Sequence, residues 1–360
     1  MTMQRAIRVG MPLWLVVALV PSWSGAPPAT DAQEIRSAFQ STSTEMTPAS
    51  RAAVEKGIDW LISAMHGDGG VGPDLDRDPE LGCTAMVGMA LLAEGNTTHG
   101  GPHSRELRRV LHAVLNMVEF RPLPNESYEN PLVRRKIGDH ADLFIATLFL
   151  TQIYGEAPAD QADIERMLRK LVNMISAAQG EDGTWGDDSW APVLGTVLGW
   201  ECLRGASSCG LRVHISAKRA GEALFKKLRD SGEDPRGMMH AFYKSASSIR
   251  VLHSMGYRDD PVFKKCVERI LRVAHSESPL YTVAGGEEYL AFFFVTECML
   301  QEPDEAWQAW YPEVSKRIVK VQNDDGSWSG HHCITGRTFC TAAALMTIQA
   351  RNLCLPISEL

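Results

Sequence analysis

Apolar residues recur between residues 51 and 350 with the period of amphipathic helices, and turns rich in glycine, proline and aspartate separate the helical segments. One unit occurs six times: a helix with a charged face, a turn, and a second helix rich in small and apolar residues. Successive units begin about 50 residues apart, which is within the range of repeats built from helical hairpins. No alternating run is long enough to predict a strand. The pattern therefore predicts an all-α repeat protein.

The first helix of each unit is predicted to lie outside, because its charged face needs water, whereas the second is apolar nearly all round and needs burial on every side. The outer helices are predicted at residues 51–65, 104–120, 162–179, 216–231, 260–276 and 305–322. The inner helices are predicted at residues 83–95, 140–155, 191–205, 240–256, 287–301 and 337–350. Six such pairs predict an (α/α)6 toroid of six inner and six outer helices, in a single domain over residues 51–355.

The N-terminal segment has the layout of a secretory signal. Arg5 and Arg8 precede an apolar stretch from Met11 to Val20, and small residues and prolines follow. We expect residues 1–32 to be a signal peptide and residues 33–50 to be a flexible linker. The apolar run, about ten residues long, is too short for a membrane span, so none is expected in the mature chain. The protein is expected in the periplasm or outside the cell, tethered only if the signal stays uncleaved.

The charge of the chain indicates which classes of ligand it can bind, and its cysteines raise the question of disulfides. The formal net charge is −8 and no basic stripe is interleaved with aromatic residues, which excludes a nucleic-acid partner. A small-molecule, lipid-like or glycan ligand is expected instead. The chain has eight cysteines, and its sequence fixes no pairing among them. Most lie in apolar helical segments, as buried free thiols do.

Two turns carry a resemblance to known families. The segments QGEDGTWGDDSW (179–190) and QNDDGSWSG (322–330) resemble the Q-x-x-D-G-S/T-W turn of squalene and oxidosqualene cyclases and of protein prenyltransferase β subunits. HGDGGVGPD (66–74) resembles a degraded third copy. Asp-Gly forms the tight turn, and Trp185 and Trp328 are expected to pack between helix pairs. The resemblance covers most of residues 51–350 and implies the same toroid.

The catalytic residues of these families do not carry over. Cyclases of this kind have a proton-donating Asp in an Asp-x-Asp-Asp-Thr-Ala segment, and the matching segment Glu80–Ala85 has Gly82 at that position. Protein prenyltransferases bind zinc through an Asp-x-Cys-Tyr segment and a later His. The matching positions hold Glu288 instead of the cysteine and Arg337 instead of the histidine. Neither activity is supported by the sequence.

In a double ring, all turns from outer to inner helices lie at one end, so the residues that open the inner helices surround one mouth. Helix N-termini there favour an anionic ligand. Glu287 or Glu288 is expected to form either a structural salt bridge with Arg337 or a base-and-clamp pair around a ligand. The candidate catalytic residues are Glu287, Glu288, Arg337 and His240, and the candidate ligand-pocket residues are Trp190, Tyr243, His140 and Tyr289.

His331, His332 and Cys333 have side chains that suit zinc or another divalent metal, and His240 or a glutamate from 287–288 would complete a tetrahedral set. Adjacent ligands rarely all point at one ion, so at most two of the three are expected to bind. Alternatively, the histidines bond only to turn carbonyls and loop polar groups.

Three functions follow from these observations. The first is an exported toroid that binds or transforms an apolar, isoprenoid-like ligand at the mouth. The second is an envelope enzyme similar to polysaccharide lyases that acts on an acidic glycan. The third is a non-catalytic interaction scaffold, in which the turn residues are only structural.

Overall fold

The computed structural model describes residues 46–120, 131–185, 189–230, 238–276, 279–301 and 304–352. These residues form 13 α-helices and two short 3-10 helices, and apart from one isolated bridge between Met65 and Val71 they contain no strand pairing. The predicted signal peptide and most of the predicted linker lie outside the described residues. No helix in the described part combines the length and apolarity needed to cross a membrane.

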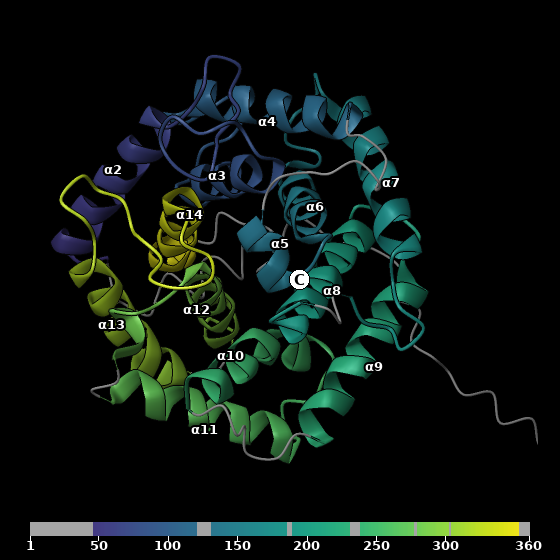
Figure 1. The fold of residues 1–360 in the computed structure, drawn as a ribbon, viewed down its shortest axis with the longest axis vertical. Coiled ribbons are helices and arrows are strands. Elements are labelled where there is room, and N and C mark those ends of the chain that lie inside the picture. The colour runs from purple at the N-terminus through teal and green to yellow at the C-terminus, as the bar shows by residue number, and fades with distance from the viewer. Residues whose placement is uncertain are drawn as a thin grey trace, which may run out of the picture.

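Twelve of the helices form two concentric rings (Figure 1). The outer ring consists of α2 (Pro48–Ser63), α4 (Ser104–Glu119), α7 (Gln161–Ala177), α9 (His214–Asp230), α11 (Pro261–His275) and α13 (Asp304–Lys320). The inner ring consists of α3 (Leu81–Ala93), α6 (Ala141–Ile153), α8 (Pro192–Ser208), α10 (Met238–Ser254), α12 (Gly286–Met299) and α14 (Arg337–Gln349). The predicted toroid is confirmed, and each helix end lies within three residues of its predicted position.

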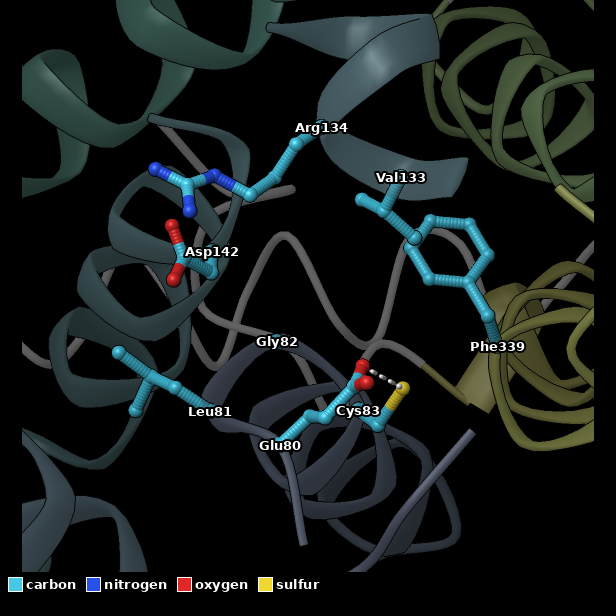
Figure 2. A pocket seen from close by; sticks show the side chains of 8 residues that line it. All are labelled: Glu80, Leu81, Gly82, Cys83, Val133, Arg134, Asp142 and Phe339. Atoms are coloured by element: carbon cyan, nitrogen blue, oxygen red, sulfur yellow. Dashed lines mark hydrogen bonds between the residues drawn. The ribbon is translucent and has the colours of Figure 1, made fainter. Parts of the chain in front are cut away.

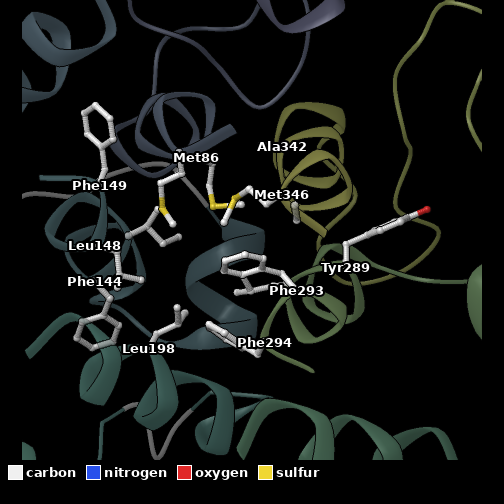
Figure 3. Close-up of a cluster of buried hydrophobic side chains, with 14 of the residues drawn as sticks. Met86, Phe144, Leu148, Phe149, Leu198, Tyr289, Phe293, Phe294, Ala342 and Met346 are labelled. Carbon is white, nitrogen blue, oxygen red and sulfur yellow. The ribbon is translucent and has the colours of Figure 1, made fainter. Parts of the chain in front are cut away.

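Burial separates the two rings as the hydrophobic pattern predicts. Every residue of α3, α6 and α12 is buried, whereas α4 buries one stripe that includes Leu107, Leu111 and Val114. Apolar side chains of the inner helices converge on the ring axis and fill it (Figure 3). They include Met86, Leu148, Leu198, Phe293, Phe294 and Met346. The centre of the toroid is therefore a packed core in the described structure.

The tryptophan turns bind to the helices of their own pair. The Trp328 Nε1–H donates to the Ile318 carbonyl at 2.8 Å, and its backbone N–H donates to Thr341 Oγ1 at 2.9 Å. The Trp185 Nε1–H donates to the Ile175 carbonyl at 2.9 Å in the same way. Both rings are buried, which confirms that they are packing residues.

Residues 66–74 adopt the same turn with valine at the tryptophan position. Gly69 has φ +95°, as Gly183 and Gly326 have φ +87° and +92° in the other two turns, and an L side chain rarely adopts this conformation. The Val71 N–H donates to Thr84 Oγ1 at 2.9 Å, the bond that Trp328 makes with Thr341. The third copy of the turn is thus present.

The remaining helix, α5 (Pro131–Ile137), was not predicted. It lies inside the double ring in Figure 1, beside α6 and α8. Lys136 and Ile137 are buried, and the carbonyls of Arg135 and Lys136 accept the backbone N–H groups of Trp190 and Ala191 at 3.0 and 2.7 Å. These bonds fix the C-terminal end of α5 to the start of α8.

We predict that Gly199→Ala lowers the free energy of unfolding by about 1–2 kcal/mol, because overpacking a well-filled core outweighs the helix propensity gained. A Cβ at Gly199 would lie 2.6 Å from Trp185 Cε3. Gly82→Ala in α3 is the matched control, since its Cβ would meet nothing closer than 3.5 Å. Urea unfolding of both variants measures the difference, and equal stability of the two would contradict the prediction.

Candidate active site at the mouth of the inner ring

The start of α12 brings two carboxylates together. Glu287 and Glu288 are both buried, and Glu288 Oε2 accepts the Gly285 N–H at 2.8 Å, which caps the helix. The loop before α14 runs alongside, because the Gly286 N–H donates to the Ile334 carbonyl at 2.8 Å. A Cβ at Gly285 would lie 2.5 Å from the His332 carbonyl, so glycine is needed for this approach.

The side chain of Lys136 on α5 also contacts Glu287. Its Nζ lies 2.9 Å from Glu287 Oε1 and 3.4 Å from Cys333 Sγ, and its side chain is 5% exposed. Burial by itself would lower the pKa of Lys136, but the Glu287 carboxylate outweighs it and raises that pKa. Burial likewise opposes ionisation of Glu287, but His332 and Lys136 together lower its pKa. Glu287 and Lys136 therefore form a buried ion pair.

His332 connects this pair to solvent. Its Nδ1 lies 3.4 Å from Glu287 Oε1 and its Nε2 lies 3.4 Å from Glu288 Oε2, while the side chain is 39% exposed. The hydrogen bond to Glu287 raises the pKa of His332. Burial, with the neighbouring Glu287 charge, raises the pKa of Glu288 to about 7. A carboxyl group with a pKa of about 7 and an imidazole with a raised pKa thus meet at one point, as in many active sites.

The adjacent Cys333 completes a set of metal-ligand types. The ligand atoms of Glu287, His332 and Cys333 all lie within 4.8 Å of one another. The side chain of His331 is exposed and does not join them. Burial, followed by the Glu287 charge, raises the pKa of the Cys333 thiol. The structure thus brings together two of the three predicted ligands and one of the two glutamates.

A small pocket opens on the other side of α5 (Figure 2). Its lining consists of Glu80, Leu81, Gly82, Cys83, Val133, Arg134, Asp142 and Phe339. The space inside it that can take the centre of a water molecule is about 10 Å³. Arg134 points towards Asp142 in Figure 2, and the Cys83 thiol donates to Glu80 Oε2 at 3.7 Å. The described pocket has room for roughly one water.

Arg337 lies away from the glutamates. Its Nη2 is 2.6 Å from Asp74 Oδ1, its Nη1 is 2.7 Å from Asp325 Oδ2, and its guanidinium carbon lies 5.1 Å from the centroid of the Trp60 ring. The expected pairing of Arg337 with Glu287 or Glu288 is therefore not formed among the described residues. Arg337 instead links the first helix pair to the last turn.

The other predicted residues have different surroundings. Tyr289 is buried, packs edge-on against Phe292 at 6.0 Å and points away from the ring centre in Figure 3. His140 precedes α6 and lies 6.4 Å from the Phe144 ring. Trp190 is 51% exposed beside α5. The side chains of His240 and Tyr243 lie outside the described part of the structure.

Sequence reasoning missed Lys136 altogether. The basic run Arg134–Lys136 precedes the inner helix at 140–155 and has the composition of a solvated surface segment. Its position before an inner helix, next to the predicted mouth, was the one signal that pointed to the site.

No sequence profile of a protein family matches this chain, and no curated protein matches it. Solved structures do match. An α-1,6-mannanase of family GH76 from Salegentibacter sp. HEL1_6 is 12% identical, with a TM-score of 0.56, over 84% of this chain and 99% of the mannanase. The type II terpene cyclase MstE from Scytonema, with its bound substrate geranylgeranyl dihydroxybenzoate, is 14% identical, with a TM-score of 0.52, over 85% of this chain and 98% of the cyclase. Both confirm the toroid fold, including its resemblance to terpenoid cyclases.

We predict that Arg337→Ala lowers the free energy of unfolding by about 1–2 kcal/mol, because it removes two partly exposed ion pairs and a cation–π contact. Arg166→Ala is the control, since Arg166 on α7 pairs with Glu119 and Asp163 at the exposed surface. Urea unfolding compares the two variants. A loss no larger than that of Arg166→Ala would show that the ring does not depend on this contact.

We predict that the titration of Glu288 lowers the free energy of unfolding by about 2 kcal/mol between pH 5 and 8 and that Glu288→Gln removes this contribution. The folded protein holds the Glu288 proton up to a pKa of about 7, whereas the unfolded chain releases it near the ordinary value of 4.5. The raised pKa of His332 acts in the same direction, because folding favours its protonated form. Unfolding curves at several pH values measure the slope, with exposed Glu55→Gln as control. Parallel curves for wild type and Glu288→Gln would contradict the prediction.

Proposed function

We propose that the protein is an exported acid–base enzyme that acts on an acidic glycan at the N-terminal mouth of the inner ring. His332 carries the proposal, because its ring is half-exposed while both of its nitrogens face buried carboxylates. Such a residue can contact a ligand at the surface and share a proton with the buried carboxylates. Export is supported by the signal-like pattern of residues 1–32.

The packing of the toroid favours a polar ligand over an isoprenoid one. Phe293, Phe294 and Met346 fill the ring axis, and the described pocket at the mouth holds about one water. An isoprenoid chain would need a deep apolar cavity. A glycan can instead lie across the mouth and present one sugar to His332.

The surroundings of the mouth favour an anionic sugar. Arg134, Arg135 and Lys136 lie on α5, and Arg135 is exposed. Trp190, exposed beside Arg135, offers an apolar ring face on which a sugar can stack. A glycan ligand also has a precedent in this fold, since a variant of the Salegentibacter mannanase was solved with α-1,6-mannotriose.

The geometry fits β-elimination better than hydrolysis. A glycosidase needs two carboxylates that flank the bond, but Glu287 is fully buried and Glu288 faces the Gly285 N–H. In elimination, neutral His332 turns one ring nitrogen from its glutamate, 3.4 Å away, to the sugar, and takes the proton from the carbon next to the uronate carboxylate. A carbon–carbon double bond forms, the glycosidic bond breaks, and the leaving oxygen takes a proton from solvent. Glu287 and Glu288 stabilise the imidazolium that results, while Arg135 balances the uronate charge.

We predict that the purified protein releases unsaturated sugars from a polymer of uronic acids, seen as a rise in ultraviolet absorbance. His332→Ala should lower the rate at least about 100-fold, because it removes the base. His331→Ala is the matched control, since that side chain is exposed and lies outside the cluster. The rate should rise with pH, because the raised pKa keeps His332 protonated at lower pH. Equal losses in both variants, or no unsaturated product from any uronate polymer, would refute the proposal.

A metal-binding site is the second candidate function. Glu287, His332 and Cys333 fit a zinc or other transition-metal site by ligand type, and Glu287 Oε1 accepts no well-aligned hydrogen bond. The ion would have to displace Lys136 Nζ, which already lies against Glu287 and Cys333. Native mass spectrometry without chelators distinguishes the two candidates. One bound metal per chain that is lost in Cys333→Ser would favour the metal site, and a metal-free chain would favour proton transfer by His332 alone.

A further inference from the structure

Lys136 and Cys333 meet at the mouth although 197 residues separate them in the chain. The Nζ and Sγ atoms lie 3.4 Å apart. We propose that this pair is a modification site, at which an oxidant of the peroxide class joins Lys136 Nζ to Cys333 Sγ in a covalent nitrogen–sulfur bond.

The chemistry balances in two steps. Peroxide first oxidises the Cys333 thiol to a sulfenic acid, in which sulfur loses two electrons and one water is released. The Lys136 amine then attacks the sulfur, the nitrogen–sulfur bond forms, and the sulfenic oxygen leaves as a second water. One proton of the Lys136 ammonium leaves with the sulfenic oxygen as water and a second passes to solvent, while Glu287 Oε1, 2.9 Å from Lys136 Nζ, holds the nitrogen in place.

The arrangement of the other cysteines favours the lysine as the partner. Cys83, Cys202, Cys266, Cys298 and Cys340 are buried, and none of the described cysteines forms a disulfide. Cys209 and Cys333 are the two half-buried thiols among the described residues. The Cys209 thiol contacts the Thr151 carbonyl at 3.8 Å, whereas Cys333 has the Lys136 nitrogen within reach. Cys209 is therefore a control of similar burial in the same chain.

The bond would change access to the mouth. It would tie α5 to the loop before α14, and it would remove a positive charge from beside Glu287. This consequence for activity rests on the proposed function, whereas the bond itself does not. The structure thus assigns Lys136 and Cys333 as an oxidative lock on the candidate site.

The test is peptide mapping by mass spectrometry after the full-length protein is treated with hydrogen peroxide. We expect a joined pair of peptides that contain Lys136 and Cys333, about 2 Da lighter than their sum, and its loss after treatment with a thiol reductant. Cys333→Ser should abolish the link and Cys209→Ser should keep it. Lys136→Arg should also abolish it, because arginine keeps the charge towards Glu287 but is not deprotonated to a nucleophile.

Three results would overturn the proposal. In the first, Cys333 is oxidised to sulfinic or sulfonic acid while Lys136 stays free. In the second, Cys333 forms a disulfide with another cysteine. In the third, peroxide modifies Cys209 but leaves Cys333 unchanged. The uronate assay on the reduced, unlinked protein separates this proposal from the proposed function: a reduced protein that is inactive but still forms the link with peroxide would refute only the activity.

Discussion

The closure of the ring is the constraint on which the rest of the structure depends. The inner helices are apolar nearly all round, so each needs a neighbour on both sides, and the last helix α14 must therefore pack against α3 and α2 of the first repeat. Polar contacts fix this junction. Gln322 Nε2 donates to the Ala53 carbonyl at 2.8 Å, and Arg337 joins Asp74 to Asp325. An open arc of the same helices would leave two apolar faces in water.

Closure also creates the mouth. Because every unit runs in the same direction, all inner helices begin at one end of the ring, and the loops that precede them meet there. The inner helices α12 and α14 thereby bring Glu287 and the His332–Cys333 loop together. Helix α5 then lies inside this end and brings Lys136 to Glu287. Burial of such charges carries a desolvation cost that only close pairing offsets.

The sequence was sufficient for the fold because the signals that specify it are local and repeated. The period of the apolar residues in each helix shows which of its faces are buried, and Trp185 and Trp328 mark turns between the outer and inner helix of a pair. The site was predicted in part: Glu287, His332 and Cys333 do come together. The orientation of Arg337 was not predictable, because the sequence does not show that Asp74, 263 residues away, lies next to it. Lys136 was missed for the same reason, since its partners come from the far end of the chain.

A second buried charge cluster differs from the one at the mouth, where we propose the function. Near the C-terminal ends of α8, α10 and α12, Arg250 Nη1 lies 2.7 Å from Glu297 Oε2, and its Nε lies 3.1 Å from Glu201 Oε1. These three side chains are each 1% exposed, so a ligand cannot reach them. They join three inner helices through buried ion pairs, which favours a single arrangement of those helices. The cluster at the mouth differs in one respect, because half-exposed His332 gives its protons a route to solvent. The cluster at the mouth can therefore exchange protons with solvent or a ligand, whereas the Arg250 cluster can only join helices.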